Sequence, residues 1–226
     1  MARSVIVTGG FGVLGQAVAE SFAAAGDRVA RIDFAASART AIAGTLDVGS
    51  VDLTDAASTR AALDKVVAVH GGIDVLVNVA GGFTWETLEG GSIESWARMQ
   101  SMNLMTAATI TQLALPELRK SSAGRIVNIG AGAAIKAGMG MGAYAASKSG
   151  VHRLTEALAE ELAGSSVTVN AVLPSIIDTP TNRADMPDAD FSQWVQPDAI
   201  ADVIGFLASD AGRSVSGALI PVTRGA

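Results

Sequence analysis

The 226-residue sequence contains no cysteine, which excludes disulfides, thiolate nucleophiles and cysteine-rich metal sites. Aromatic residues make up only 4% of it, and no apolar stretch approaches the roughly 18 residues of a membrane helix. Positive charge is also scarce, since the net charge is −6 and the isoelectric point is near 4.9. An acidic chain is a poor partner for nucleic acid or an anionic membrane. A strand-like run begins at Ser4, so no signal peptide is visible and a cytoplasmic protein is expected.

Apolar residues make up 49% of the sequence, and they are chiefly alanine and valine. Such small residues, together with 25 glycines, suit parallel strands buried on both faces and helices packed closely over them. No repeat or linker-like segment interrupts the chain. We therefore expect one domain, spanning residues 1–226.

Short apolar runs alternate with longer helical patterns along the whole sequence. The expected strands are Ser4–Val7, Arg28–Ile32, Val48–Asp52, Ile73–Val79, Arg125–Ile129, Ser166–Val172 and Ala218–Val222. The expected helices are Val13–Ala25, Asp55–Val69, Ile93–Leu118, Ala143–Ala163 and Pro197–Ala208. This alternation predicts an α/β fold, a Rossmann-type doubly wound parallel sheet of about seven strands with helices on both faces. Ligands of such sheets bind at the carboxyl ends of the strands, where the strand order reverses.

Residues typical of helix ends stand at the expected boundaries. Thr54 is expected to cap the second helix, Gly26 and Gly164 follow helices, and Pro197 stands at a helix start.

A glycine-rich turn follows the first strand and opens the first helix. Gly10, Gly12 and Gly15 form a literal G-x-G-x-x-G. In this context one glycine permits the tight turn, the next lets a pyrophosphate approach the backbone, and the third lets helix and strand pack closely. The free N–H groups of the helix then receive the phosphates. The turn predicts a dinucleotide site.

Asp33 ends the second strand, eighteen residues after Gly15. A carboxylate there accepts hydrogen bonds from the adenosine ribose and repels the extra phosphate of NADP. Arg31 and Arg39 lie nearby in the sequence, where they offer a phosphate alternative partners. We expect NAD(H) to be preferred, with NADP(H) as the alternative.

Tyr144, the only tyrosine, stands four residues before Lys148 on a predicted helix, so the two side chains share one face. A free phenol has a pKa near 10 and is a poor acid–base at neutral pH. A neighbouring ammonium is expected to lower that pKa and so to make the phenol useful in proton transfer.

These features together resemble the short-chain dehydrogenase/reductase family over nearly the whole chain. The resemblance rests on the turn Thr8–Gly15, Asp52-Leu53, Asn78-Val79-Ala80-Gly81, Met102-Asn103-Leu104, the Tyr144–Lys148 pair and Pro174 to Thr179. It implies hydride transfer between a nicotinamide and a small-molecule carbonyl or related group, in a homodimer or homotetramer. Tyr144 would be the general acid, Lys148 would bind the nicotinamide ribose, and Asn103 would hold a water in a proton relay.

The expected cofactor contacts combine the turn, the acidic residue and the family segments. They are Gly9, Gly10, Phe11, Gly12, Val13, Leu14, Gly15, Asp33, Asp52, Leu53, Asn78, Ala80, Gly81, Tyr144, Lys148, Pro174, Ile177 and Thr179. Of these, Asn78 to Gly81 would line the adenosine side, and Ile177 and Thr179 would contact the nicotinamide amide.

The sequence departs from the family pattern at two positions. A glycine is usual where Val13 stands, and a substrate-polarising serine is usual thirteen residues before the tyrosine, where this chain has Ala131. Alanine offers no side-chain hydrogen bond, so one electrostatic contribution to the transition state is missing or supplied otherwise.

One branch of the family, the dihydropteridine reductases, shares this absence. The chain is similar to it in the glycine-rich turn, in Val79-Ala80-Gly81-Gly82, around Ala131, and most closely between Asp178 and Trp194. A quinonoid dihydropterin is already an activated acceptor, which removes the need for the serine. Common descent alone also explains the similarity, because fold does not dictate substrate.

Several other residues have either a structural or a functional interpretation. Phe83, Trp85 and Trp194 either stack on a flat substrate or close the core. His70 and His152 lack a companion ligand pattern, so solvated or interface positions are expected and no metal site is predicted.

The sequence thus predicts an NAD(H)-dependent oxidoreductase acting on a small carbonyl or quinonoid substrate. Two alternatives stay open: a general carbonyl or 3-oxoacyl reductase, and a nicotinamide-sensing protein with little turnover.

Overall fold

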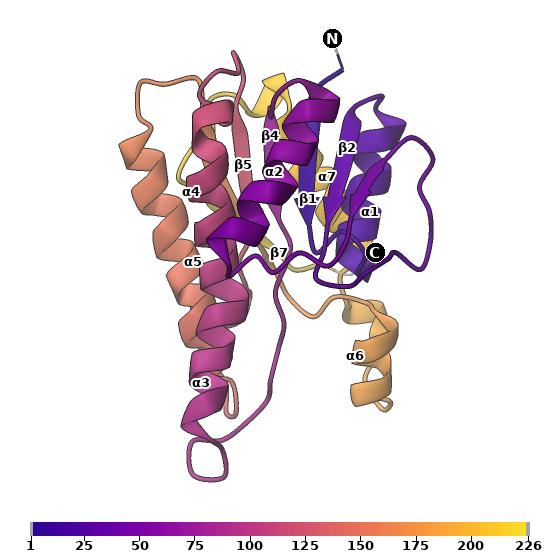
Figure 1. Cartoon of the computed structure of the whole chain (residues 1–226). Coiled ribbons are helices and arrows are strands. Elements are labelled where there is room, and N and C mark those ends of the chain that lie inside the picture. The colour runs from indigo at the N-terminus through magenta and orange to yellow at the C-terminus, as the bar shows by residue number, and fades with distance from the viewer. Residues whose placement is uncertain (1, 225–226) are drawn as a thin grey trace.

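In the computed structural model, which describes residues 2–224, seven strands form one sheet (Figure 1). All neighbouring strands are parallel, in the order β3-β2-β1-β4-β5-β6-β7. The strands are β1 (Ser4–Thr8), β2 (Arg28–Ile32), β3 (Leu46–Val48), β4 (Val75–Asn78), β5 (Arg125–Ile129), β6 (Thr168–Pro174) and β7 (Leu219–Val222). The chain runs outward from β1 to β3 and then returns to place β4 beside β1. This reversal confirms the predicted doubly wound sheet.

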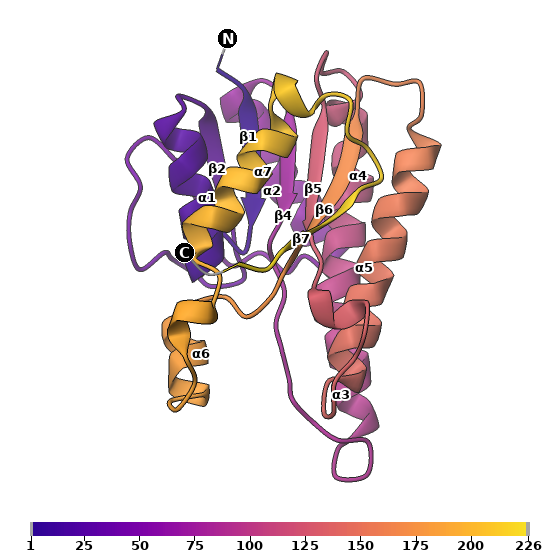
Figure 2. The same cartoon turned by 180° about the vertical axis from the view of Figure 1, so that it is seen from behind.

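Helices cover both faces of the sheet. They are α1 (Val13–Ala24), α2 (Ala56–His70), α3 (Ile93–Met99), α4 (Thr106–Leu118), α5 (Gly142–Glu161), α6 (Pro180–Asp185) and α7 (Pro197–Ala208). Figure 1 shows α2, α4 and α5 on one face, and Figure 2 shows α1 and α7 on the other. No helix within residues 2–224 is both long and apolar enough to cross a membrane.

Alternate residues of each strand enter two separate cores. Ile6, Leu76 and Ile126 pack beneath α2, α4 and α5, whereas Val5 and Val75 pack beneath α1 and α7. These five side chains are fully buried, and each such burial contributes about 1.5–3 kcal/mol. Burial on both faces explains why the strands are continuous apolar runs.

Strand boundaries differ from expectation where the chain turns. The third strand was predicted as Val48–Asp52 but is Leu46–Val48. Ser50 adopts a positive φ of 58°, and its N–H donates to the carbonyl of Ala35, so the ladder ends before it. The fourth strand ends at Asn78 because the N–H groups of Val79 and Ala80 turn to the Thr8 hydroxyl, 3.0 Å away in both cases.

Two helix predictions also need correction. Asp55, not Thr54, caps α2, since its carboxylate accepts from the N–H groups of Ala57 and Ser58. The single helix expected over residues 93–118 is interrupted by a π-helical turn, η1 (Gln100–Met105), between α3 and α4. Here the N–H of Thr106 donates to the carbonyl of Ser101, five residues back. The expected positions of Gly26 and Gly164 after helices, and of Pro197 at the start of a helix, are confirmed.

Candidate active site

The expected site residues follow the carboxyl ends of the strands, at one edge of the sheet. In Figures 1 and 2 this is the lower edge, beyond which α3 and α6 extend on opposite sides. Thr8, Ile32, Asn78, Ile129 and Pro174 end β1, β2, β4, β5 and β6 there. Since the strands are parallel, their ends bring together segments that are far apart in the sequence.

The glycine-rich turn has little space for side chains. Gly9 has a φ of +61°, and a Cβ on it would lie 2.9 Å from the backbone of Ala80. A Cβ on Gly15 would overlap the carbonyl of Gly9, so helix and turn pack without a gap. Gly12 is exposed at the N-cap of α1 and supplies no side-chain cap. The first N–H groups of α1 therefore face outward as an anion-binding end.

Three neighbours of these glycines differ in exposure. Phe11 is half-buried, Val13 is 45% exposed, and Leu14 is buried in the core. Leu14 was expected to contact a cofactor, but only its backbone remains at the turn. A Cβ on Gly10 would lie 2.7 Å from that of Arg31, which ties the turn to β2.

Asp33 lies beside the turn, as its spacing predicted. One carboxylate oxygen accepts from the N–H of Phe11 at 2.9 Å, and the other from the N–H of Ala35 at 2.9 Å. These bonds fix the carboxylate next to the phosphate-binding end of α1. Each carboxylate oxygen retains lone pairs for further donors, such as ribose hydroxyls.

Arg31 is not available to a phosphate in this structure. Its side chain is fully buried, and Nε and Nη2 form a bidentate pair with Asp47 at 2.8 and 2.6 Å. Nη1 donates to the carbonyl of Thr40, and the guanidinium lies 5.3 Å from the centre of the Phe11 ring. The predicted role of Arg31 as an alternative phosphate partner is therefore wrong for this conformation, whereas Arg39 is exposed.

Two residues expected on the adenosine side have their side chains committed elsewhere. The exposed Asp52 accepts from both the N–H and the hydroxyl of Thr54, and these hydrogen bonds lower the pKa of its carboxyl group. Leu53 is buried in the core beneath α2. Only the Leu53 backbone is left to meet an adenine.

Asn78 also turns into the protein. Its amide nitrogen donates to Thr111 on α4 at 2.9 Å and to Asn128 on β5 at 2.8 Å. Asn128 in turn donates to Thr155 on α5 at 2.8 Å. This buried polar network joins the sheet to two helices, so the Asn78 side chain orders the strand end and does not line a ligand site.

Gly81 brings the two halves of the expected catalytic group together. A Cβ on this glycine would lie 2.5 Å from Oδ1 of Asn103 and 3.5 Å from Nζ of Lys148. Ala80, just before it, is half-buried. Any side chain at position 81 would fill the space beside the lysine.

Tyr144 and Lys148 lie one turn apart on α5, as predicted. Tyr144 is half-buried, and the Phe83 ring meets its ring edge-on with centroids 4.9 Å apart. Nζ of the buried Lys148 donates to the carbonyl of Ile129 at the end of β5, at 2.7 Å.

The expected electrostatic effect within this pair is not present. Burial raises the pKa of Tyr144 to about 12 and lowers the pKa of Lys148 to about 8. The phenol is thus a weaker acid than in water, because burial disfavours the charged phenolate.

Asn103 occupies the π-helical turn, and its side chain is fully engaged. Its amide nitrogen donates to the carbonyl of Gly82 at 3.1 Å and to the hydroxyl of Ser147 at 2.9 Å. Its oxygen accepts from the N–H of Gly82 at 2.8 Å. Ser147 donates onward to the carbonyl of Tyr144. Both amide hydrogens are therefore used, so the side chain that was expected to hold a relay water braces the loop after β4 against α5.

The segment after β6 is tied back to the sheet end. Pro174 ends the strand, and Ile177 pairs with Val195. The Thr179 hydroxyl caps α6 by accepting from the N–H of Asn182, whose side chain donates to the carbonyl of Ile177. The predicted nicotinamide contacts at Ile177 and Thr179 thus lie in an ordered loop.

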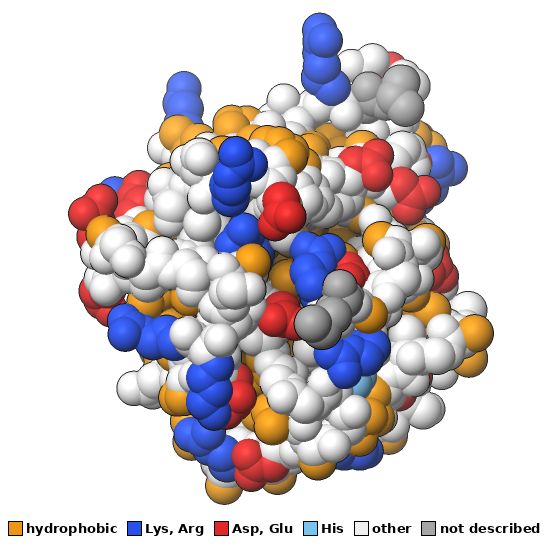
Figure 3. All heavy atoms as spheres, turned by 90° about the horizontal axis from the view of Figure 1, so that it is seen from above, with side chains coloured by type: hydrophobic (Ala, Val, Ile, Leu, Met, Phe, Trp, Pro, Cys, Tyr) orange, Lys and Arg blue, Asp and Glu red, His pale blue; other side chains and the backbone are white. Residues whose placement is uncertain are grey.

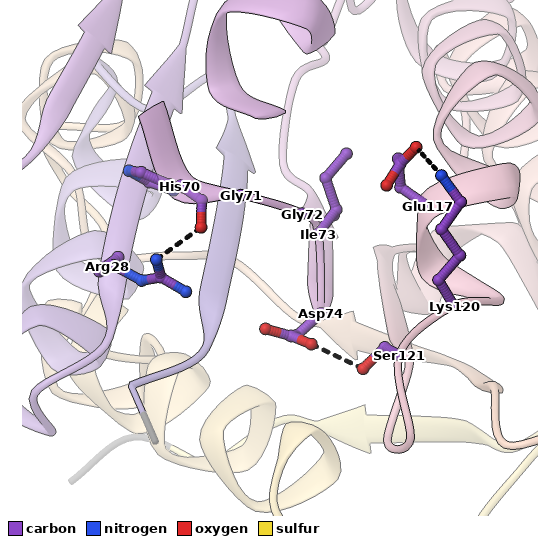
Figure 4. Close-up of a pocket in the computed structure, with 9 residues that line it drawn as sticks. All are labelled: Arg28, His70, Gly71, Gly72, Ile73, Asp74, Glu117, Lys120 and Ser121. Atoms are coloured by element: carbon purple, nitrogen blue, oxygen red, sulfur yellow. Dashed lines mark hydrogen bonds and ion pairs between the residues drawn. The ribbon is translucent and has the colours of Figure 1, made fainter. Parts of the chain in front are cut away.

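A polar cavity of about 200 Å³ lies at the opposite, amino-terminal edge (Figure 4). Arg28 donates to the carbonyl of His70 at the end of α2, and Asp74 accepts from the Ser121 hydroxyl at 2.6 Å. Lys120 pairs with Glu117 at 2.6 Å. Figure 3, which looks onto this edge, shows acidic and basic side chains interspersed on its surface. The cavity contains none of the predicted site residues.

Comparison with known proteins decides the family. Residues 3–190 match the family model described as short chain dehydrogenase. The chain belongs to the short-chain dehydrogenases. A 3-oxoacyl-[acyl-carrier-protein] reductase of Thermotoga maritima is 32% identical over 97% of this chain and 96% of its own length. The D-threitol dehydrogenase of Mycolicibacterium smegmatis is 34% identical over 99% and 92%.

Solved structures agree with this short-chain dehydrogenase fold. The ligand-free aldohexose dehydrogenase of Thermoplasma acidophilum matches with a TM-score of 0.88 and 28% identity, covering 98% of this chain and 92% of that one. A 3-ketoacyl-(acyl-carrier-protein) reductase of Brucella melitensis, complexed with NADH, matches with a TM-score of 0.88 over 97% and 96%. At 24% identity, the second match supports the fold alone. As a short-chain dehydrogenase, the chain is an oxidoreductase, and its family uses NAD(P)(H).

The glycine turn, Asp33 and the polar groups around Gly81 fit a dinucleotide. Because the turn is built of glycines, no side chain fills the space through which a pyrophosphate would approach the backbone. Ala131, at the position of the usual serine of short-chain dehydrogenases, is 4% exposed. The chain therefore keeps the glycine-rich turn of the family but has no hydroxyl at position 131.

Sequence reasoning missed the buried histidines of this short-chain dehydrogenase. His70 and His152 were expected in solvated or interface positions, but they are only 6% and 3% exposed. His152 follows Lys148 by four residues, so helical spacing alone places it on the face of α5 that carries Tyr144 and Lys148. Of the aromatic residues considered, Trp194 is buried, while Phe83 and Trp85 are about half exposed.

Proposed function

We propose that this short-chain dehydrogenase is an NAD(H)-dependent reductase of a small, planar substrate that brings its own activation. Tyr144 donates the proton, and Lys148 and Asn103 organise the site around it. Bound NAD(H) supplies the hydride. The observation that carries the proposal is Ala131, which has no hydroxyl and whose N–H already donates to His152 at 3.3 Å.

Ala131 matters because a carbonyl oxygen gains negative charge as it is reduced. Each donor aimed at such an oxygen is worth roughly 10²–10³ in rate. The Ala131 backbone N–H already donates to His152, and its side chain is a methyl group. Neither can donate to the oxygen of an unactivated ketone, so the transition state of its reduction is less stabilised here. A quinonoid or imine-type substrate needs less of it.

The ionisation of Tyr144 favours reduction over oxidation. With a pKa near 12, the phenol carries its proton at neutral pH, which is the form that reduction uses, although it is a weaker acid than an ordinary tyrosine. Oxidation requires the phenolate, which burial disfavours in the free protein. Lys148, with a pKa near 8, remains charged at neutral pH.

The surroundings of Asp33 support NAD(H) over NADP(H). The Asp33 carboxylate is fixed beside the glycine-rich turn, the position at which this family meets the adenosine ribose, and Arg31, the nearest guanidinium in the sequence, is held by Asp47. A phosphate at this position would meet a negative charge without a free buried cation to balance it.

The covering segment supports a dihydropterin as the substrate. The stretch from Asp178 to Trp194, which resembles dihydropteridine reductases, includes an Asp178–Arg183 ion pair and a buried Trp194 whose ring packs at a tilt of 53° against that of Phe191. The half-exposed ring of Phe83 offers a flat apolar surface next to Tyr144, and the half-exposed ring of Trp85 lies against Gly140. These features suit a planar heterocycle.

The test is NADH oxidation, with NADPH in parallel, against quinonoid dihydropterin, simple ketones, aldehydes, quinones and a 3-oxoacyl thioester. We expect the pterin to be turned over with NADH at least tenfold more efficiently than the ketones. Preference for the thioester would replace the proposal by a 3-oxoacyl reductase, the activity named for the Thermotoga maritima relative.

The variant Ala131→Ser sharpens this test. It restores the missing hydroxyl, so turnover of simple ketones should rise by about tenfold or more while pterin turnover changes little. An equal rise for both substrates would show that the native substrate is not self-activated.

We further propose that the working unit is a homodimer or homotetramer. Large apolar side chains stand exposed on the helices, including Val69 on α2 and Phe206 on α7, at 60% and 47%. Light scattering of the purified chain tests this, and a monomeric mass in an active preparation would contradict it.

A further inference from the structure

Two side chains of α5 and the backbone of β6 hold three consecutive residues at the end of β5. Lys148 donates to the carbonyl of Ile129, and His152 accepts from the N–H of Ala131 at 3.3 Å. Between them, the N–H of Gly130 donates to the carbonyl of Val172 on β6 at 2.9 Å. The wall of the candidate active site next to Ala131 is thus fixed from both the helix and the neighbouring strand.

His152 stands in line with the catalytic pair. Tyr144, Lys148 and His152 are spaced by four residues and share one face of α5. A Cβ on Gly130 would lie 2.5 Å from Nε2 of His152 and 2.8 Å from its Cδ2, so the ring fits only because residue 130 is glycine. The ring and the glycine form one packed unit.

The hydrogen bond defines the protonation state of the ring. Because the Ala131 N–H is a donor, Nε2 must carry no proton and Nδ1 carries it in the neutral tautomer. Burial lowers the pKa of His152, and the charges that face it are Arg153 and Lys148, which lower it further, and Glu156, which raises it. The ring is therefore neutral at neutral pH, while a proton on Nε2 in acid removes the acceptor and places a second cation beside Lys148.

We propose that His152 is a positioning residue of the reductase, which holds the Ala131 backbone where the family serine is absent and releases it when protonated. This inference rests on the proposed function for its effect on turnover. The neutral ring keeps Ala131 and the Ile129 carbonyl in register, and so keeps Lys148 beside Tyr144. Protonation pushes the Ala131 N–H away and loosens that arrangement.

Two substitutions separate hydrogen bonding from titration. In His152→Gln the side-chain carbonyl replaces Nε2 as an acceptor that does not titrate, whereas His152→Leu fills space without accepting. We expect the acid limb of the kcat/KM profile, measured with quinonoid dihydropterin and NADH from pH 5 to 8, to disappear in the Gln variant. The Leu variant should lose about tenfold in kcat at every pH, with the KM for NADH unchanged.

His70→Gln is the matched control, since it replaces a buried histidine at the other edge of the sheet. Its pH profile should equal that of the unmodified protein. An acid limb that persists unchanged in His152→Gln, or disappears in His70→Gln, overturns the proposal.

Amide hydrogen exchange of the full chain gives a second readout that needs no substrate. The Ala131 amide should be protected at pH 7 in the unmodified protein and in His152→Gln, and should exchange about tenfold faster in His152→Leu. The Gly130 amide, bound to Val172, serves as the internal reference. Equal Ala131 exchange in all three proteins, with Gly130 also unchanged, refutes the positioning role. Where the Leu variant folds poorly, its Gly130 amide also exchanges faster, and the pH profile of His152→Gln then decides. If Ala131 behaves as expected but no carbonyl or quinonoid substrate is turned over, the proposed function fails and the hydrogen bond stands.

Discussion

The two edges of the sheet use polar residues in opposite ways. At the amino edge, Arg28 donates to the carbonyl that ends α2, and Asp74 accepts from Ser121, so the polar groups that line the cavity bind one another. At the carboxyl edge, glycines leave backbone N–H groups at the start of α1, and Asp33 is fixed beside them. Internal pairing stabilises the first edge, whereas the second leaves groups free for a ligand. A cavity by itself is therefore a poor guide to this site.

The largest effect is expected from Tyr144→Phe, at the carboxyl edge of the sheet. Removing the hydroxyl leaves the ring and its contact with Phe83 but deletes the proton donor. Turnover should fall by roughly 10²–10⁴, the usual contribution of general acid catalysis. NADH binding, followed by fluorescence titration, should be nearly unchanged. A variant as active as the unmodified protein would remove Tyr144 from the mechanism.

A pair of glycine substitutions compares the two edges directly. Gly15→Ala places a Cβ against the carbonyl of Gly9, so the turn must open and NADH affinity should drop by about tenfold or more. Gly72→Ala, beside the amino-edge cavity, meets nothing within 4 Å and should change neither affinity nor stability. Calorimetric titration with NADH measures the affinity of each variant. Similar losses of affinity in the two variants would show a general folding effect.

Cofactor choice should respond to Asp33 by a smaller amount. Asp33→Ser removes the repulsion toward a 2′-phosphate and the bonds to the ribose, so the NADPH-to-NADH ratio of kcat/KM should rise by about tenfold, or ~1.4 kcal/mol. Asp47→Asn loosens the hold on Arg31 and should raise the ratio further when combined with it. An unchanged ratio in the double variant would place the selectivity elsewhere.

The smallest effect concerns stability at the amino edge. Burial lowers the pKa of His70 below its usual 6.5, and nearby Arg28 lowers it further. The unfolded chain therefore binds a proton that the folded chain refuses, so the free energy of unfolding falls as the pH drops below 6.5, by at most about 1.4 kcal/mol per unit. Urea unfolding at pH 5 to 7.5 should show a shallower slope in His70→Gln. If this variant keeps the full slope, other groups cause the acid sensitivity.

Local patterns predicted much of this structure because they report local physics. Alternating strands and helices gave the sheet and its two layers, and the glycine spacing located the turn that Gly9 and Gly15 require. Asp33 was found by its distance from that turn, and Tyr144 with Lys148 by their helical spacing. Strand ends were less accurate, because a single turn residue such as Ser50 decides them.

Only the tertiary structure decided what these residues meet. The ion pair of Arg31 with Asp47 and the bond from Asn78 to Asn128 join strands that the sequence separates, so no spacing rule foretells them. Burial likewise reversed the expected pKa shift of Tyr144, since desolvation depends on every element packed around a group. The sequence by itself determined the family, the sheet and the places of the side chains proposed to be catalytic. The folded environment determined their protonation and their partners.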